Sequence, residues 1–203
     1  MKYLGVTLDN TLDGKSMVES ILSKINSKLK FLYRKRKFLN KNICRLLCNS
    51  LIQPHYDFAC CSWYPLLTLG LKDRLQISQN KCIRFCLSLN NRDRIDGARF
   101  IEINWLPVAL QVEQCICALI YKYLNNNVPA YIGEMFTVNL AKYNTRNPQK
   151  FNRPQCSTSK GQKAISYVGP TLWDEMPNVL KQKKSIASFK HDFKKYKLNK
   201  LSR

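Results

Sequence analysis

Nine cysteines are the residues of this 203-residue chain whose spacing first suggests chemistry. Cys44 and Cys48 are four residues apart, as are Cys82 and Cys86, so each pair shares a helical face and offers two thiolates to a metal ion. Both pairs lie within apolar runs, there is no C-x2-C pair, and the chain has only two histidines. We therefore expect packed, reduced thiols, as in cytosolic or nuclear proteins, with no metal site and no cofactor.

Asp57 is the residue that most resembles a catalytic acid, because it is the only formal charge between Arg45 and Lys72. A hydrogen-bonded carboxylate near a helix end is the simpler interpretation, and we favour it over catalysis. The chain has no glycine-rich phosphate loop, no H-E-x-x-H, no G-x-S-x-G and no D-D or D-x-D pair for two metal ions. We expect no enzymatic activity from these residues.

Positive charge is the strongest chemical signal in the composition. The chain has 34 Lys and Arg against 13 Asp and Glu, a formal net charge of +21. Such a charge favours a polyanionic partner, namely RNA, DNA or an RNA–DNA hybrid. An acidic membrane is the weaker alternative, because no basic amphipathic anchor stands out and the longest apolar run, residues 115–121, is too short to span a bilayer. We expect a nuclear or cytoplasmic location.

Basic residues on predicted helices are the candidate phosphate contacts. Four of them are consecutive, Arg34 to Lys37, and four helical residues span most of the circumference, so they cannot all face one ligand. The same run also matches a nuclear import signal. The expected nucleic-acid-binding residues are Lys24, Lys28, Arg34, Lys35, Arg36, Lys37, Lys41, Arg45, Lys81, Arg84, Arg146 and Arg153.

The first elements that must position these residues are a short strand and a long helix. Residues 2–8 have the composition of a strand, and turn residues follow it. Ser16 and Glu19 have the spacing of a capping box, which predicts the start of a helix. The helix is expected to bury a stripe formed by Val18, Ile21, Leu22, Ile25, Leu29 and Leu32.

Residues 43–65 are the most apolar passage and are predicted to form the centre of the core. Ile43, Leu47 and Leu51 recur at helical spacing, so we expect them to be buried. Pro54 should bend the chain before further core residues. These are the aromatic residues Tyr56, Phe58 and Trp63. A third helix, residues 71–87, should direct Leu71, Leu75, Cys82 and Cys86 inward.

The second half of the chain is expected to form another helical lobe. The polar break at residues 90–97 is the candidate boundary, and a helix should run from Pro107 to the asparagines at 125–127, with a short helix at 129–136. Residues 137–163 are basic and predicted to be extended or partly disordered, and residues 164–168 are predicted to form a short strand. Trp173 should anchor the core. Ser185 should cap a last helix that aligns Ile186, Phe189, Phe193 and Tyr196.

The predicted fold is mainly α, with a helical lobe preceded by a short strand and followed by a second helical lobe with a short β or extended basic segment. The predicted divisions are residues 1–12, 13–90, 98–136, 137–163 and 164–203.

Seven segments, which follow one another in the same order along the chain, resemble one family. They are KYLGVTLDNTL at 2–12, PHYDFACCSW at 54–63, LQISQNKCIRF at 75–85, WLPV at 105–108, YKYLNNNVPAYI at 121–132, SYVGPTLWDEMP at 166–177 and SIASFK at 185–190. Together they resemble the C-terminal part of the reverse transcriptases of non-LTR retrotransposons of the jockey and CR1 type. The chain departs from the family pattern at Gly14 and Met17, where an aromatic residue and a histidine are common, and at Gln111, where an arginine often follows WLPV.

The resemblance implies a thumb, which is the lobe that holds a template–primer duplex, and the region C-terminal to it. It also implies a primer-grip-like role for Tyr3, Leu4 and Gly5. The catalytic palm of the family, which carries the metal-binding aspartates, would lie upstream of these residues and would be a partner of this lobe. The alternatives are a retroelement remnant without a selected role, a structural helper of a separately encoded polymerase, or a free-standing basic chromatin or RNA-binding module.

Overall fold

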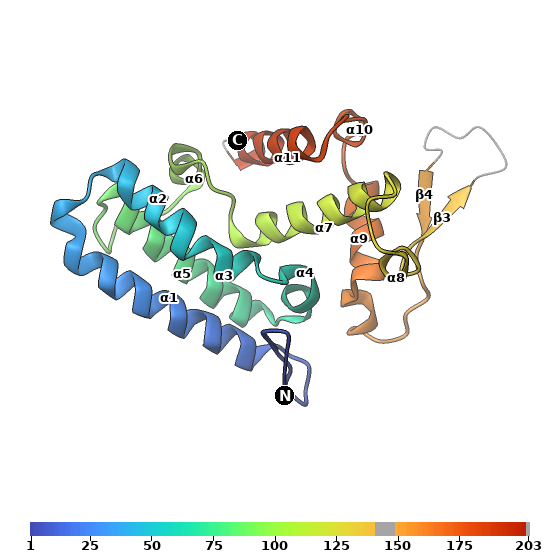
Figure 1. Ribbon diagram of the computed structural model, residues 1–203, viewed down its shortest axis with the longest axis horizontal. Helices are drawn as coiled ribbons and strands as arrows, with labels where there is room; N and C mark the ends of the chain where they lie inside the picture. Colours follow the sequence, from blue (N-terminus) through green and yellow to red (C-terminus); the bar gives the residue numbers. More distant parts are fainter. Residues whose placement is uncertain (141–148, 202–203) are drawn as a thin grey trace. The chain divides into compact units, whose positions relative to one another are not determined.

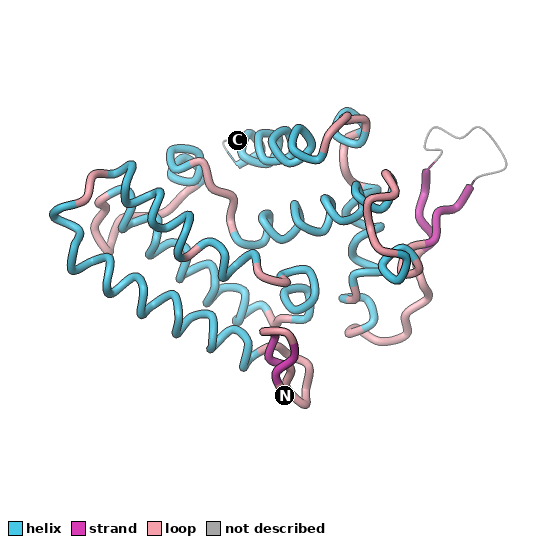
Figure 2. The backbone as a smooth tube through the Cα atoms, in the orientation of Figure 1, coloured by secondary structure: helices cyan, strands magenta, loops and turns pink. Residues whose placement is uncertain are grey.

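The computed structural model describes residues 1–140 and 149–201 and is mainly α-helical, as predicted (Figures 1 and 2). The chain divides into two compact units. Unit 1 comprises Met1–Val112 and Tyr196–Arg203, and unit 2 comprises Glu113–Lys195. The division falls beyond the polar break at residues 90–97, because the helix that follows this break packs against the helix that precedes it.

Unit 1 contains a β-hairpin and a series of helices. In chain order they are β1 (Lys2–Tyr3), β2 (Val6–Thr7), α1 (Lys15–Lys35), η1 (Arg36–Phe38), α2 (Lys41–Leu51), α3 (Gln53–Asp57), α4 (Cys60–Trp63), η2 (Tyr64–Leu66), α5 (Leu69–Leu87) and α6 (Gly97–Ile103).

The strand predicted at residues 2–8 is instead an antiparallel hairpin. Lys2 pairs with Thr7, and Tyr3 pairs with Val6. Leu4 and Gly5 form the turn, and both have positive φ angles. A two-residue turn of this hand suits the twist of a hairpin, so the chain reverses where a single strand was expected.

The helix α1 begins without the predicted capping box of Ser16 and Glu19. Its N-cap is Gly14, in the left-handed conformation, and no side chain of the cap accepts a hydrogen bond. The carboxylate of Asp9 accepts the backbone N–H of Asp13 at 3.1 Å and that of Ser16 at 3.5 Å. Any Cβ at Gly14 would lie 2.6 Å from Leu67 Cδ2. Asp9, in the preceding turn, therefore accepts from backbone N–H groups at the start of α1, a role that the capping-box motif had assigned to the Ser16 hydroxyl.

The helices α1, α2 and α5 form the core of unit 1 (Figure 1). The stripe predicted for α1 is buried apart from Leu22, which is half-buried. Gly14 approaches Leu67 at one end of α1, and the ring of Tyr33 lies 5.0 Å from that of Phe85 at the other, so α1 and α5 run parallel. The predicted inward face of α5 is confirmed at Leu71, Leu75, Cys82 and Cys86.

The buried face of α2 includes Cys44 and Cys48, which were expected to be packed, but differs from the predicted stripe of Ile43, Leu47 and Leu51. Cys44, Cys48 and Ile52 are buried, whereas Ile43 and Leu51 are 41% and 38% exposed. The buried set and the predicted set both recur every four residues, but they are offset by one position, which is about 100° around the helix. The cysteine face is the one that packs against α5, because its small side chains let the two helices approach closely. The hydrophobicity of the leucines therefore misled the prediction.

The helix is interrupted next to Pro54, since α2 ends at Leu51 and α3 begins at Gln53 with Pro54 in its first turn. Two of the three aromatics that follow are buried as expected, Tyr56 and Trp63. Phe58, predicted to lie in the core, is 50% exposed. Asp57 is the last residue of α3 and accepts a hydrogen bond from Gln111, in agreement with the structural interpretation of its carboxylate.

All nine cysteines are free thiols, and six of them are buried. A hydrogen bond with Cys48, together with burial, raises the pKa of the Cys86 thiol. Burial raises the pKa of Cys82 as well. The thiols of Cys82 and Cys86 therefore stay protonated and act as small apolar groups.

Unit 2 is built from the second half of the chain, and α7 and α11 extend into unit 1. Its elements are α7 (Val108–Leu124), α8 (Ala130–Gly133), β3 (Thr137–Leu140), β4 (Gln149–Asn152), η3 (Gly161–Lys163), α9 (Ile165–Asp174), α10 (Asn178–Lys181) and α11 (Ile186–Leu201).

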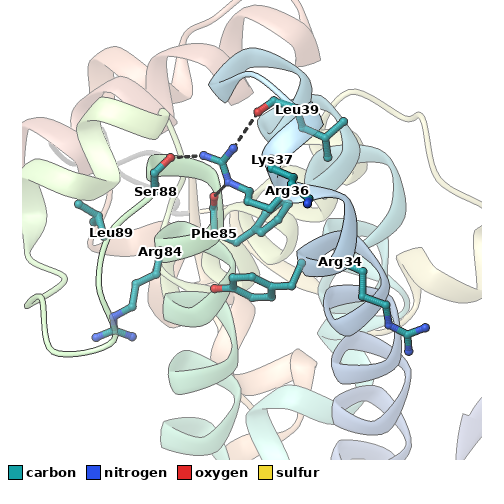
Figure 3. A pocket seen from close by; sticks show the side chains of 9 residues that line it. Arg34, Arg36, Lys37, Leu39, Arg84, Phe85, Ser88 and Leu89 are labelled. Carbon is teal, nitrogen blue, oxygen red and sulfur yellow. Dashed lines mark hydrogen bonds between the residues drawn. The ribbon is translucent and has the colours of Figure 1, made fainter.

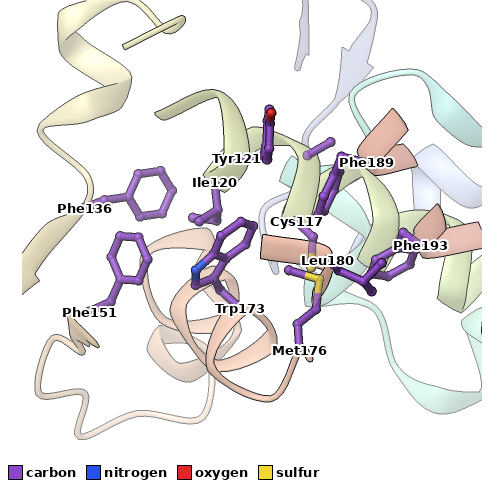
Figure 4. Close-up of a cluster of buried hydrophobic side chains, with 11 residues drawn as sticks. Cys117, Ile120, Tyr121, Phe136, Phe151, Trp173, Met176, Leu180, Phe189 and Phe193 are labelled. Atoms are coloured by element: carbon purple, nitrogen blue, oxygen red, sulfur yellow. The ribbon is translucent and has the colours of Figure 1, made fainter. Parts of the chain in front are cut away.

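Aromatic side chains fill the core of unit 2 (Figure 4). Phe189 lies between the rings of Tyr121 and Trp173, with centroids 5.0 and 6.0 Å away. Trp173 is 2% exposed, which confirms it as a core anchor. Phe151 is also buried, on strand β4. Within the segment predicted to be β or extended, β3 and β4 pair as antiparallel strands.

The strand predicted at residues 164–168 is wrong, because this stretch begins the helix α9. A Cβ at Gly169 would lie 3.1 Å from Ile120 Cδ1, so the glycine lets α9 approach α7 closely. This tertiary contact overrides the local β propensity. In α11, Ser185 accepts the N–H of Ser188 as predicted, but Tyr196 is 39% exposed.

Within the part of the chain that the structure describes, no single helix is long and apolar enough to cross a membrane. Helices α6 and α7 together have the length and apolar composition of a membrane span, but their axes are bent by 59° at the break between them.

The aromatic core of unit 2 predicts a large difference between two phenylalanine truncations. Phe189→Ala should lower the free energy of unfolding by about 3–5 kcal/mol, because it leaves a cavity between Tyr121 and Trp173. Phe38→Ala, at a site that is 74% exposed, should change it by less than about 0.5 kcal/mol. Urea unfolding followed by circular dichroism measures both, and equal losses would contradict the assigned core.

Candidate nucleic-acid interface

Basic side chains lie in two rows on α1, away from its buried stripe. Lys24, Lys28 and Lys35 are separated by four and seven residues and share one row. Lys30 and Arg34, four residues apart, form the second row, and both are exposed. Glu19 is the only acidic residue of α1. A helix whose apolar stripe is buried in this way holds these charges at fixed intervals along its length.

Arg36 belongs to the charge run at residues 34–37 but is held inside unit 1 (Figure 3). Its Nε donates to the carbonyl of Phe85 at 3.1 Å, one terminal nitrogen donates to the carbonyl of Leu39 at 2.7 Å, and the other donates to Ser88 Oγ. The guanidinium also lies over the ring of Phe85, 5.5 Å from its centroid. Arg36 therefore joins the end of α1 to the end of α5.

Lys28 is likewise held by the fold. Its Nζ donates to the carbonyl of Leu51, the last residue of α2, at 2.9 Å, and lies 2.7 Å from His55 Nε2. Burial, then the nearby ammonium groups of Lys28 and Lys24, lowers the pKa of His55. His55 is thus neutral at pH 7, and its Nε2 accepts the hydrogen bond from Lys28.

Two further candidate residues are bound to groups of the protein. Arg84 donates through Nε and one terminal nitrogen to the carbonyl of Asp93, at 3.2 and 2.9 Å. Arg153 of unit 2 forms a 3.1 Å ion pair with Asp174. These contacts fix the guanidinium groups and reduce the number of donors that can reach a ligand.

The remaining candidates are exposed or lie outside the described residues. Lys41 and Arg45 are exposed and four residues apart on α2, and Lys81 is exposed on α5. Arg146 lies outside the described residues. The structure brings four of the candidates together around one cavity, and these are Arg34, Arg36, Lys37 and Arg84.

This cavity has a volume of about 550 Å³ and lies between the end of α1 with η1 and the end of α5 (Figure 3). We name it the α1–α5 pocket. Its lining combines the four cations with apolar and aromatic side chains and one serine, and it contains no acid. The other lining residues are Tyr33, Leu39, Phe85, Ser88 and Leu89.

Three exposed aromatic residues of this region are absent from the predicted nucleic-acid-binding residues. Phe31, Tyr33 and Phe38 are 57%, 45% and 74% exposed. They alternate with the basic residues between Lys30 and Lys37, and exposed rings among cations are typical of surfaces that bind single-stranded nucleic acid. The aromatic residues among these basic ones were therefore the sequence feature from which this surface could have been predicted.

The residues predicted to resemble a primer grip lie in the β1–β2 hairpin. Tyr3 and Leu4 are 60% and 81% exposed, and Leu4 and Gly5 form the turn. The hairpin packs against α1 through β2. Among the described residues, no group of three or more His, Cys, Asp or Glu side chains is arranged to hold a metal ion.

Comparison of the chain with known proteins gives no match. No family model matches it, and neither do the curated proteins or the solved structures. The resemblance to reverse transcriptases therefore remains a prediction from the seven sequence segments.

The contacts of Arg36 predict that it stabilises unit 1. Arg36→Lys keeps the charge but loses the planar fork that reaches Phe85, Leu39 and Ser88, so it should lower the free energy of unfolding by about 1–3 kcal/mol. Lys37→Gln, at the exposed neighbour, should change it by less than about 0.5 kcal/mol. Urea unfolding of both variants tests this, and a stability loss as small for Arg36→Lys as for Lys37→Gln would contradict the role.

The lowered pKa of His55 predicts a pH dependence of stability. The folded state binds a proton less readily than the unfolded chain, so the free energy of unfolding should fall as the pH drops below about 6.5 and towards the lower pKa of the folded state. His55→Gln can still accept from Lys28 and does not titrate, so it should flatten this dependence.

The measurement is the urea midpoint between pH 7.5 and 5.0, with His191→Gln as the matched control. The control should keep the wild-type pH dependence, because His191 is exposed on α11. If the wild-type urea midpoint is constant over this pH range, or if it changes with pH equally in His55→Gln, then His55 does not contribute to the pH dependence of stability.

Proposed function

We propose that unit 1 binds an RNA–DNA hybrid or RNA duplex through its phosphates, as the thumb-like lobe of a retrotransposon polymerase does. The observation that carries the proposal is the pair of basic rows on α1, backed by a buried apolar stripe and continued by Lys37 in η1. The seven segments that resemble non-LTR reverse transcriptases support the same role.

The spacing of the exposed charges supports phosphate binding rather than a diffuse charge effect. Lys30 and Arg34 are one helical turn apart, about 6 Å along the axis, which is close to the distance between successive phosphates of a nucleic-acid strand. Lys24 and Lys35 add positive charge in the other row of α1. Lysine and arginine side chains with few nearby acids release condensed counterions when they reach phosphates, and this supplies sequence-independent affinity.

The division between anchored and exposed cations refines which residues would touch the ligand. Arg36 and Lys28 are held by main-chain carbonyls, so their contribution to duplex binding is mainly to the positive potential and to the fold. Lys30, Arg34 and Lys37 are exposed and reach outward. The proposed contacts are therefore made mainly by the exposed residues, including Lys35.

A second candidate is a structural helper of a polymerase, and one observation favours it. Helix α2 exposes an apolar surface at Ile43, Leu46 and Leu51, which are 41%, 65% and 38% exposed. Exposed apolar side chains that neighbour each other on a helix favour contact with a protein. Such docking would depend on apolar burial and respond weakly to salt, which separates it from phosphate binding.

Replacing the exposed basic residues should weaken binding and change its salt dependence. The triple variant Arg34→Gln, Lys35→Gln, Lys37→Gln leaves Arg36 and its carbonyl contacts in place. Its affinity for unrelated RNA–DNA hybrids should fall about equally, and the logarithmic salt slope should flatten by roughly one to three units, at about 0.9 per phosphate lost. Fluorescence anisotropy at a series of salt concentrations measures both quantities.

The matched control removes the same charge from unit 2, through Lys184→Gln, Lys190→Gln and Lys195→Gln, all of which are exposed. It should keep most of the slope, because the charge is removed from unit 2 and every basic residue of α1 is kept. Equal effects of the two triple variants would show that net charge alone drives binding, and an unchanged slope in the α1 variant would rule out the proposed surface.

A further inference from the structure

The α1–α5 pocket has properties that a surface for duplex phosphates does not need. It is concave, with a volume of about 550 Å³, and it has aromatic and aliphatic walls as well as cations. A duplex presents phosphates to such a surface but keeps its base faces stacked inside. Apolar walls beside fixed positive charge are instead suited to a ligand that has both an anionic group and an exposed planar ring.

We propose that the α1–α5 pocket binds one unpaired nucleotide next to a nucleic-acid duplex, with its base against Tyr33 and its phosphate near the guanidinium of Arg36. This inference rests on the proposed function, because it assigns a particular part of the same ligand to a particular part of unit 1.

Tyr33 provides the surface for the base. Its ring is 45% exposed, and its edge-to-face contact with Phe85, at 5.0 Å and 73°, holds the ring in one orientation. A ring that is already fixed loses little conformational entropy when a base stacks on it. Leu39 and Leu89 complete the apolar part of the lining.

Arg36 provides the charge for the phosphate. Its guanidinium is held in place by Phe85, Leu39 and Ser88, and none of these partners is an acid that would neutralise it. Arg34 and Lys37 lie at the same pocket and are exposed, so they can close on a phosphate from the outside. No acid is among the lining residues, so no carboxylate of the lining offsets the charge of the four cations.

Burial raises the pKa of Tyr33, so its hydroxyl stays protonated and adds no negative charge beside the phosphate. The volume of the pocket also suits the proposed occupant, since small-ligand pockets range from roughly 300 to 1,000 Å³ and a single nucleotide is a ligand of this size.

The test compares two RNA–DNA hybrids of the same length and sequence, one with blunt ends and one with a three-nucleotide single-stranded overhang. The full chain should bind the hybrid with the overhang about fivefold more tightly or better, because stacking of one base on an aromatic ring is worth at least this factor. Tyr33→Leu keeps an apolar side chain but removes the ring, so this preference should disappear. Tyr131→Leu, at a tyrosine that is 69% exposed in unit 2, should keep it.

Ser88→Asp is a second variant that protects the test against misfolding of Tyr33→Leu. Ser88 is exposed and already accepts from Arg36, so an aspartate there pairs with the guanidinium and should also abolish the preference. If the wild-type chain binds both hybrids equally, or if both variants keep the preference, the pocket proposal is overturned while duplex binding stands. If the chain binds neither hybrid, the proposed function fails and the pocket proposal fails with it.

Discussion

The shortage of carboxylates is the constraint on which the rest of this structure depends. With 34 basic residues against 13 acids, most cations have no acidic partner to pair with. Main-chain carbonyls at helix ends take that place. Lys28 donates to Leu51 at the end of α2, Arg36 donates to Phe85 in the last turn of α5, and Lys181 approaches Asp174 O at the end of α9, at 3.4 Å. These carbonyls carry the negative end of the helix dipole, so the contacts stabilise each helix without neutralising the charge.

The same arrangement sorts the basic residues into two groups with different consequences. Cations such as Arg36 hold helices together and keep a permanent positive potential within unit 1. Cations such as Lys30 and Arg34 extend from α1, and their number can vary without loss of the fold. Affinity for a polyanion and stability of the lobe can therefore change independently, although the residues are interleaved in one short sequence.

The sequence predicts the elements whose local pattern and tertiary environment agree. The stripe of α1 and the anchor Trp173 follow from spacing and hydrophobicity alone. The buried face of α2 follows only in part, because Cys44 and Cys48 are packed as expected whereas Ile43 and Leu51, which have the same periodicity, are exposed. The role of Arg36 in the fold was also unpredictable, since its acceptor Phe85 is 49 residues away and nothing in a charge run distinguishes the inward residue. The nearby aromatic residues Phe31, Tyr33 and Phe38, by contrast, could have been recognised in the sequence as candidate contacts for unpaired bases.

The buried thiols between α2 and α5 make the opening of unit 1 directly measurable. Only the thiolate reacts with alkylating reagents. In the folded state burial raises the pKa of Cys82, and a hydrogen bond with Cys48 together with burial raises the pKa of Cys86. Both side chains must therefore leave the helix interface before they react. Their alkylation rate divided by that of an unfolded thiol gives the fraction of molecules in which this interface is open. The wild-type chain thus contains its own reporter of local unfolding at the end of α5, the part of unit 1 that Arg36 fastens to α1.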